Sequence, residues 1–128
     1  MPKINLGYGR SEIPFQFDEE QFEVLGNSPE NKFLTDVEIG ERFDCPIASP
    51  PLEEIINSGE SVLIVVPDAT RQTACGQIVN LLVRRLIANG TMPFEIKIIF
   101  ATGIHRKVSD EEKREILTPF IVQRIVTL

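Results

Sequence analysis

Histidine, cysteine and tryptophan are scarce in this sequence of 128 residues, which contains one histidine, two cysteines and no tryptophan. Cys45 and Cys75 are far apart and form no C-x-x-C pair. Together with His105 they are too few and too scattered to supply the several ligands that a protein-bound metal requires. We therefore predict no metal site built from this chain alone, and two reduced cysteines with a structural role.

Long apolar runs and an excess of positive charge are also missing. The longest apolar stretch, residues 62–66, falls far short of the roughly 20 residues that span a bilayer, and the first residues lack the apolar segment of a secretion signal. Acidic residues outnumber basic ones 19 to 13, which disfavours binding to phosphate backbones. These absences predict a cytoplasmic protein with no membrane or nucleic-acid partner. Its hydrophobic content of 42% is enough to bury a core.

The first sixty residues predict a hairpin followed by a helical connection. Within residues 1–25, apolar residues alternate with others on both sides of the segment Gly9 to Glu12, as expected for two paired strands. A polar stretch follows over 26–31. The connection, residues 33–60, predicts a short helix from Phe33 to Phe43 and a second from Leu52 to Asn57, which Ser49-Pro50-Pro51 would start.

Residues 61–128 alternate strand and helix patterns. A β-branched run predicts a buried strand over 61–66, and the next apolar runs predict strands over 94–101 and 122–128. Apolar residues at helical spacing predict a helix over 74–89, and a Ser109/Glu112 capping box opens a helix that ends near Leu117. The fold class is therefore α/β: an N-terminal hairpin, then Rossmann-like β-α-β-α-β units with a mostly parallel sheet. Because the sequence stops inside an apolar strand, we expect a fragment of a longer protein.

Two loops would leave this sheet at the carboxyl ends of its strands, where α/β proteins bind ligands. The first, residues 67–73, contains Asp68, Thr70 and Arg71, and its end meets a helix N-terminus that favours anions. The second, residues 102–107, contains Gly103, which permits a close backbone approach, and His105, which can exchange a proton near neutral pH.

A purely structural interpretation of these loops is open as well. Asp68 and Thr73 are residues that commonly cap a helix, Arg71 could be a solvated surface residue, and His105 could have no task. Neither loop contains a P-loop or a G-x-G-x-x-G pattern, so the common devices for binding ATP or NAD are not indicated.

Taken together, three separated motifs resemble the N-terminal domain of the nickel-pincer-nucleotide-dependent lactate racemase family. They are Ser49-Pro50-Pro51-Leu52, Asp68-Ala69-Thr70-Arg71 after the first strand, and Ala101-Thr102-Gly103-Ile104-His105-Arg106 after the second. The order is that of the family, and the resemblance extends to Tyr8-Gly9 in the opening hairpin. Two positions depart from the common pattern, namely Ile104 and Lys107.

The resemblance implies that this chain is a fragment of a larger two-domain enzyme whose C-terminal domain is absent. In that fold, this domain faces the second one across a cleft that holds the nickel-pincer nucleotide. It also implies a chemistry: hydride leaves C2 of a small 2-hydroxyacid while a histidine takes the hydroxyl proton, and return of the hydride to the other face inverts the centre. His105 matches a catalytic acid/base histidine and Arg71 the arginine that holds the substrate carboxylate. Cofactor-binding positions correspond to Asp68, Thr70, Thr102 and Gly103.

Family members have further site residues later in their sequences, beyond the part that this chain matches. These are a second catalytic histidine, a nickel-ligating histidine and a lysine that anchors the cofactor. We therefore expect the missing C-terminal domain to be a partner of this chain, and the fragment alone to be inactive. Two alternatives remain: a nucleotide-binding α/β module without catalysis, and a purely structural unit. The sequence leaves open which 2-hydroxyacid is the substrate and what the oligomeric state is.

Overall fold

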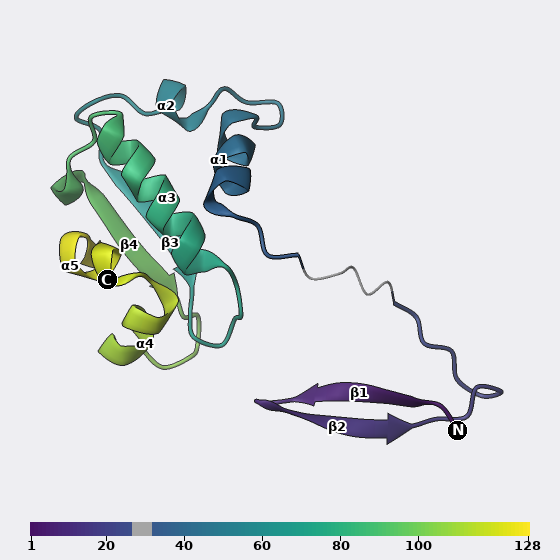
Figure 1. Ribbon diagram of the computed structural model, residues 1–128. Coiled ribbons are helices and arrows are strands. Elements are labelled where there is room, and N and C mark those ends of the chain that lie inside the picture. Colours follow the sequence, from purple (N-terminus) through teal and green to yellow (C-terminus); the bar gives the residue numbers. More distant parts are fainter. Residues whose placement is uncertain (27–31) are drawn as a thin grey trace. The chain divides into compact units, whose positions relative to one another are not determined.

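The computed structural model describes residues 1–26 and 32–128 of an α/β chain that divides into two units, Met1–Phe33 and Leu34–Leu128 (Figure 1). Most of the polar stretch predicted over 26–31 lies outside the described residues. No helix of the described part has the length and apolar character of a membrane span.

The first unit contains the predicted hairpin. Strands β1 (Lys3–Tyr8) and β2 (Ser11–Gln16) pair antiparallel, with Tyr8 opposite Ser11. The turn is shorter than predicted, because Ser11 and Glu12 already belong to the ladder. Gly9 has a φ of 61°, the left-handed conformation that a tight hairpin turn requires and that glycine adopts without strain.

The helical connection is present with shifted ends. Helix α1 (Asp36–Asp44) begins after Thr35, because Thr35 and Glu38 form a capping box that the prediction from Phe33 overlooked. Helix α2 (Leu52–Ile55) ends before the predicted Asn57, whose backbone amide donates to the Glu60 side chain instead of continuing the helix.

Arg85, on helix α3 (Cys75–Ala88), connects both short helices to α3 through hydrogen bonds. Its guanidinium donates to the Asp44 carboxylate and the Gly40 carbonyl of α1, and to the Glu53 carboxylate of α2. The same group lies over the Phe43 ring, 5.6 Å from its centroid. The partly buried Arg85 guanidinium thus holds α1 and α2 against α3.

The core follows the predicted parallel arrangement. Strands β3 (Val62–Pro67) and β4 (Ile96–Ala101) are adjacent and parallel, and β5 (Val126–Thr127) pairs parallel with the other side of β4. Helix α3 runs alongside β3 and β4 (Figure 1) and buries Val79, Val83 and Leu86 in the core. Alternate residues of β3 point away from this core and are exposed, among them Leu63 and Val65.

The strands predicted over 94–101 and 122–128 were wrong in part. Phe94 and Glu95 belong to a 3₁₀ helix (η1, Pro93–Glu95) rather than to β4, because Pro93 starts a turn that the Glu95 carboxylate closes on the Met92 amide.

The first three residues of the strand predicted over 122–128 belong to helix α5 (Pro119–Arg124), and only β5 pairs as a strand. Pro119 stands at the first helical position, and Leu117, Ile121 and Ile125 are buried at a spacing of four residues. That spacing is the helical signal hidden in the apolar run. Helix α4 (Asp110–Ile116) begins, as predicted, at the Ser109/Glu112 capping box.

Candidate functional site

The two candidate loops meet at one edge of the sheet. The parallel register pairs Pro67 at the end of β3 with Ala101 at the end of β4, so both chains leave the sheet side by side. This confirms the prediction that the loops 67–73 and 102–107 leave from the same edge, and it brings residues 37 positions apart into contact.

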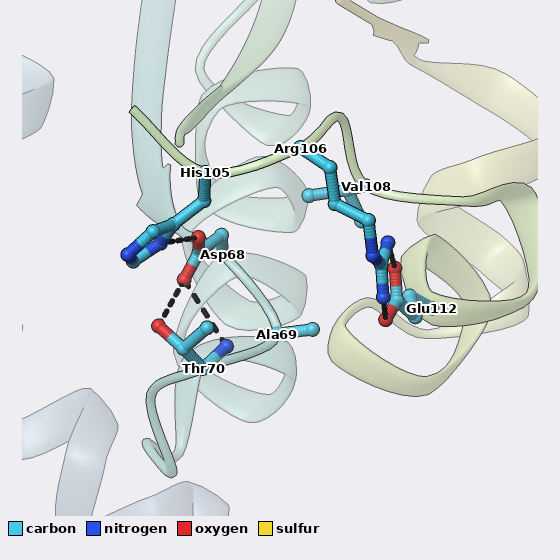
Figure 2. Close-up of a pocket in the computed structure, with 7 residues that line it drawn as sticks. All are labelled: Asp68, Ala69, Thr70, His105, Arg106, Val108 and Glu112. Atoms are coloured by element: carbon cyan, nitrogen blue, oxygen red, sulfur yellow. Dashed lines mark hydrogen bonds and ion pairs between the residues drawn. The ribbon is translucent and has the colours of Figure 1, made fainter. Parts of the chain in front are cut away.

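Three side chains of these loops form one hydrogen-bonded chain (Figure 2). The Thr70 hydroxyl donates to Oδ1 of Asp68 at 2.6 Å, and the Thr70 backbone amide donates to the same oxygen at 3.1 Å. The other oxygen, Oδ2, lies 2.7 Å from Nδ1 of His105. The structure therefore brings together three predicted site residues, Asp68, Thr70 and His105. The sequence did not predict that Asp68 binds both of the others.

Burial differs sharply along this chain. The Asp68 side chain is 6% exposed, whereas that of His105 is 50% exposed. Hydrogen bonds from Thr70, and then the contact with His105, lower the pKa of Asp68 to about 2, against the opposing effect of burial. Asp68 is consequently ionised near neutral pH. His105 lies between this buried carboxylate and the solvent.

The loop that carries His105 is anchored on its other side as well. The Arg106 guanidinium donates to both carboxylate oxygens of Glu112 at 2.9 and 2.7 Å, and the same carboxylate accepts from the Ser109 amide at the start of α4. Hydrogen bonds from Arg106, and then from Ser109, lower the pKa of Glu112 to about 2, and Glu112 raises the pKa of Arg106. A bidentate pair of this kind fixes direction as well as distance.

The backbone of the same loop makes a tight turn. The His105 amide donates to the Thr102 carbonyl at 2.9 Å, and Gly103 inside the turn has a φ of 56°. An L-residue at this position would be strained. The following side chain, Ile104, is fully exposed.

A pocket of about 200 Å³ lies between the two loops and the start of α4 (Figure 2). The residues that line it are Asp68, Ala69, Thr70, His105, Arg106, Val108 and Glu112. Not every predicted site residue reaches it. Arg71 lines a neighbouring pocket of about 440 Å³ beside the start of α3, and Thr102 lines another of about 330 Å³ with Lys107 and Lys113.

The interpretation of Asp68 and Thr73 as helix caps was wrong. The residue at the N-cap of α3 is Ala74, and no side chain caps this helix. Asp68 instead directs its carboxylate to Thr70 and His105. Its position directly after β3 predicted that it would lie at the same edge as the loop after β4, but not that it would pair with His105.

Comparison with known proteins supports the resemblance to lactate racemases. Residues 8–128 match the family described as the lactate racemase N-terminal domain. Over 116 residues the sequence is 30% identical to a lactate racemase of Lactiplantibacillus plantarum, covering 88% of this chain and 27% of that protein.

A solved structure of similar fold is the lactate racemase apoprotein from Thermoanaerobacterium thermosaccharolyticum, with a TM-score of 0.76 and 19% identity. The alignment covers 99% of this chain and 30% of that one, so the chain spans less than a third of either relative. Because the family match extends over nearly the whole sequence, this chain belongs to the family of lactate racemase N-terminal domains.

Proposed function

We propose that this chain is the N-terminal, cofactor- and substrate-binding part of a 2-hydroxyacid racemase or epimerase that works with a nickel-pincer nucleotide. The observation that carries the proposal is the contact between His105 and the buried Asp68 carboxylate, inside a chain of this family. A half-exposed imidazole with one nitrogen held by a carboxylate is suited to take and return a proton.

His105 would act on the hydroxyl group of the substrate. A 2-hydroxyacid loses hydride from C2 far more readily as the alkoxide than as the alcohol, so a base beside the hydroxyl lowers the barrier. The nickel-pincer nucleotide, when bound, would supply the hydride-accepting centre, as cofactors generally carry the redox chemistry. The protein's contribution here is the position of His105 and its ability to hold the proton until it is returned.

The exposed cations of the two loops fit an anionic cofactor and an anionic substrate. Arg71 and Lys107 are exposed, and within the described residues neither side chain has a hydrogen-bond or ion-pair partner. We propose that Arg71 holds the substrate carboxylate, for which the guanidinium fork is well shaped. Thr102 and Gly103 remain our proposed positions on the cofactor side. A direct cofactor contact fits the side chains of Asp68 and Thr70 less well, because they are already hydrogen-bonded to each other and Asp68 also to His105.

The metal would need ligands from elsewhere. Residues 1–26 and 32–128 contain no cluster of three or more potential ligands among His, Cys, Asp and Glu. The chain also spans less than a third of the length of the lactate racemases to which it is similar. We therefore propose that a further domain supplies the other wall of the site, the nickel ligand, the anchoring lysine and the second acid/base histidine.

The test is racemisation by a protein that contains this chain together with the further domain, matured with its cofactor. We expect each pure enantiomer of lactate, or of a related small 2-hydroxyacid, to approach the racemic mixture. An Arg71→Lys variant should lose much of this activity, because an ammonium group cannot form two parallel hydrogen bonds to a carboxylate. Tight binding of nucleotides without racemisation of any small 2-hydroxyacid would support a binding module instead and refute the proposal.

A further inference from the structure

We propose that Asp68 and Thr70 are positioning residues that act through His105, fixing the imidazole as the Nδ1–H tautomer and leaving Nε2 as the atom that takes a proton. The inference rests on the proposed function only where it takes the hydroxyl group of a 2-hydroxyacid as the source of this proton. The arrangement of the three side chains, and the tautomer that follows from it, stand without the racemase reaction.

The first step concerns the carboxylate. An ionised carboxylate only accepts hydrogen bonds, so a contact of 2.7 Å between Oδ2 of Asp68 and Nδ1 of His105 requires a hydrogen on Nδ1. Neutral imidazole carries one ring hydrogen, and Nε2 is then the unprotonated, basic nitrogen. Unrestrained histidine in water favours the opposite tautomer, so the Asp68 contact reverses the preference.

The second step concerns what holds the carboxylate. Both donors of Thr70, its hydroxyl and its amide, bind Oδ1 at 2.6 and 3.1 Å. This leaves Oδ2 turned toward the imidazole. With its side chain only 6% exposed, Asp68 has little surface for a ligand of its own, which favours an indirect role.

The third step concerns the accessible nitrogen. The His105 side chain is half exposed, and the far edge of its ring is directed away from Asp68 (Figure 2). The Arg106–Glu112 pair fixes the next residue of the loop, so the ring is held both by the carboxylate and by the backbone. A base held in this way loses little orientational freedom when a substrate binds.

The test uses the fact that His105 is the only histidine of the chain. Long-range ¹H–¹⁵N spectra of the 128-residue protein, recorded where the imidazole is neutral, report the tautomer without ambiguity. We expect a protonated shift at Nδ1 and an unprotonated shift at Nε2. A spectrum dominated by the Nε2–H tautomer would overturn the proposal.

The Asp68→Asn variant gives the sharpest contrast. The two Thr70 donors require an acceptor, so the amide oxygen should take the place of Oδ1 and the NH₂ group should face Nδ1. The tautomer should then invert to Nε2–H. An unchanged tautomer in the folded variant would contradict the role of Asp68.

Thr70→Val and Thr70→Ser serve as a matched pair, and they keep the test decisive if Asp68→Asn does not fold. Valine removes the hydroxyl and should raise the Nε2–H fraction, whereas serine should retain the wild-type spectrum. Equal spectra for the two would refute the role of Thr70. In the longer, cofactor-loaded protein, Asp68→Asn should lower turnover by roughly 10²-fold or more. Inverted tautomers in a protein that never racemises a hydroxyacid would leave the positioning role intact and refute the proposed function alone.

Discussion

Replacing Gly76 by alanine should destabilise the protein, although alanine is the better helix former. Gly76 lies in the first turn of α3, where the substitution would ordinarily stabilise by about 0.5–1 kcal/mol. A Cβ atom at this position, however, would lie 2.7 Å from the carbonyl oxygen of Ile116 at the end of α4. Both atoms are fixed to the main chain, and the neighbouring Leu117 is only 2% exposed, so neither can move aside cheaply.

The expected net effect is a loss of about 1–2 kcal/mol, since overpacking typically costs about 1–3 kcal/mol. For a domain of about 100 residues this corresponds to a melting temperature lower by roughly 4–16 °C. Gly40→Ala is the matched control, because Gly40 is also helical but its Cβ would meet nothing within 4 Å. Thermal unfolding followed by circular dichroism should move the two variants in opposite directions. Stabilisation by Gly76→Ala would show that α4 does not approach α3 as described.

Further predictions concern acid stability and the helical connection. Because the pKa values of Asp68 and Glu112 are lowered to about 2, both carboxylates stabilise the fold above the unfolded pKa of about 4. This stabilisation should be lost as the pH falls from about 4 through about 2. The free energy of unfolding, measured by urea titration at each pH, should therefore fall less steeply for Glu112→Gln than for the wild type. An equal pH dependence in the two proteins would contradict the lowered pKa of Glu112. Arg85→Met should lower the free energy of unfolding by about 1–2 kcal/mol, because it frees α1 and α2 from α3. The exposed Arg114→Met is its control, and equal melting temperatures for the two would refute the anchoring role of Arg85.

Sequence reasoning succeeded where one local pattern sufficed. The β-branched run before Asp68 and the apolar run before Thr102 predicted neighbouring parallel strands, and the Ser109/Glu112 box predicted the start of α4. It failed over residues 122–124, which were predicted as strand but are helical, because an apolar run is compatible with both structures. Pro119 and the burial of Ile121 against the core decide for helix there.

For the site, the sequence predicted the loops and their common edge, but not their internal partners. Thr70, Asp68 and His105 were each singled out, yet their pairing depends on turn geometry around Gly103 and on the exact register of β3 and β4. The Arg106–Glu112 pair was missed for a different reason. Glu112 was already explained by the capping box, and a bidentate partner six residues away is set by the path of the loop.

The proposed proton transfer is tested by the racemisation rate of a cofactor-loaded protein that contains this chain and the proposed further domain, with His105 replaced by alanine, measured beside the exposed control Arg114→Ala. Loss of a positioned acid/base group should lower turnover of lactate, or of whichever small 2-hydroxyacid is the substrate, by roughly 10²-fold or more, while the control keeps the wild-type rate. Circular dichroism of both variants verifies that the fold is retained. Near-wild-type racemisation by folded His105→Ala protein would contradict the proposal that His105, held by Asp68, moves the substrate's proton.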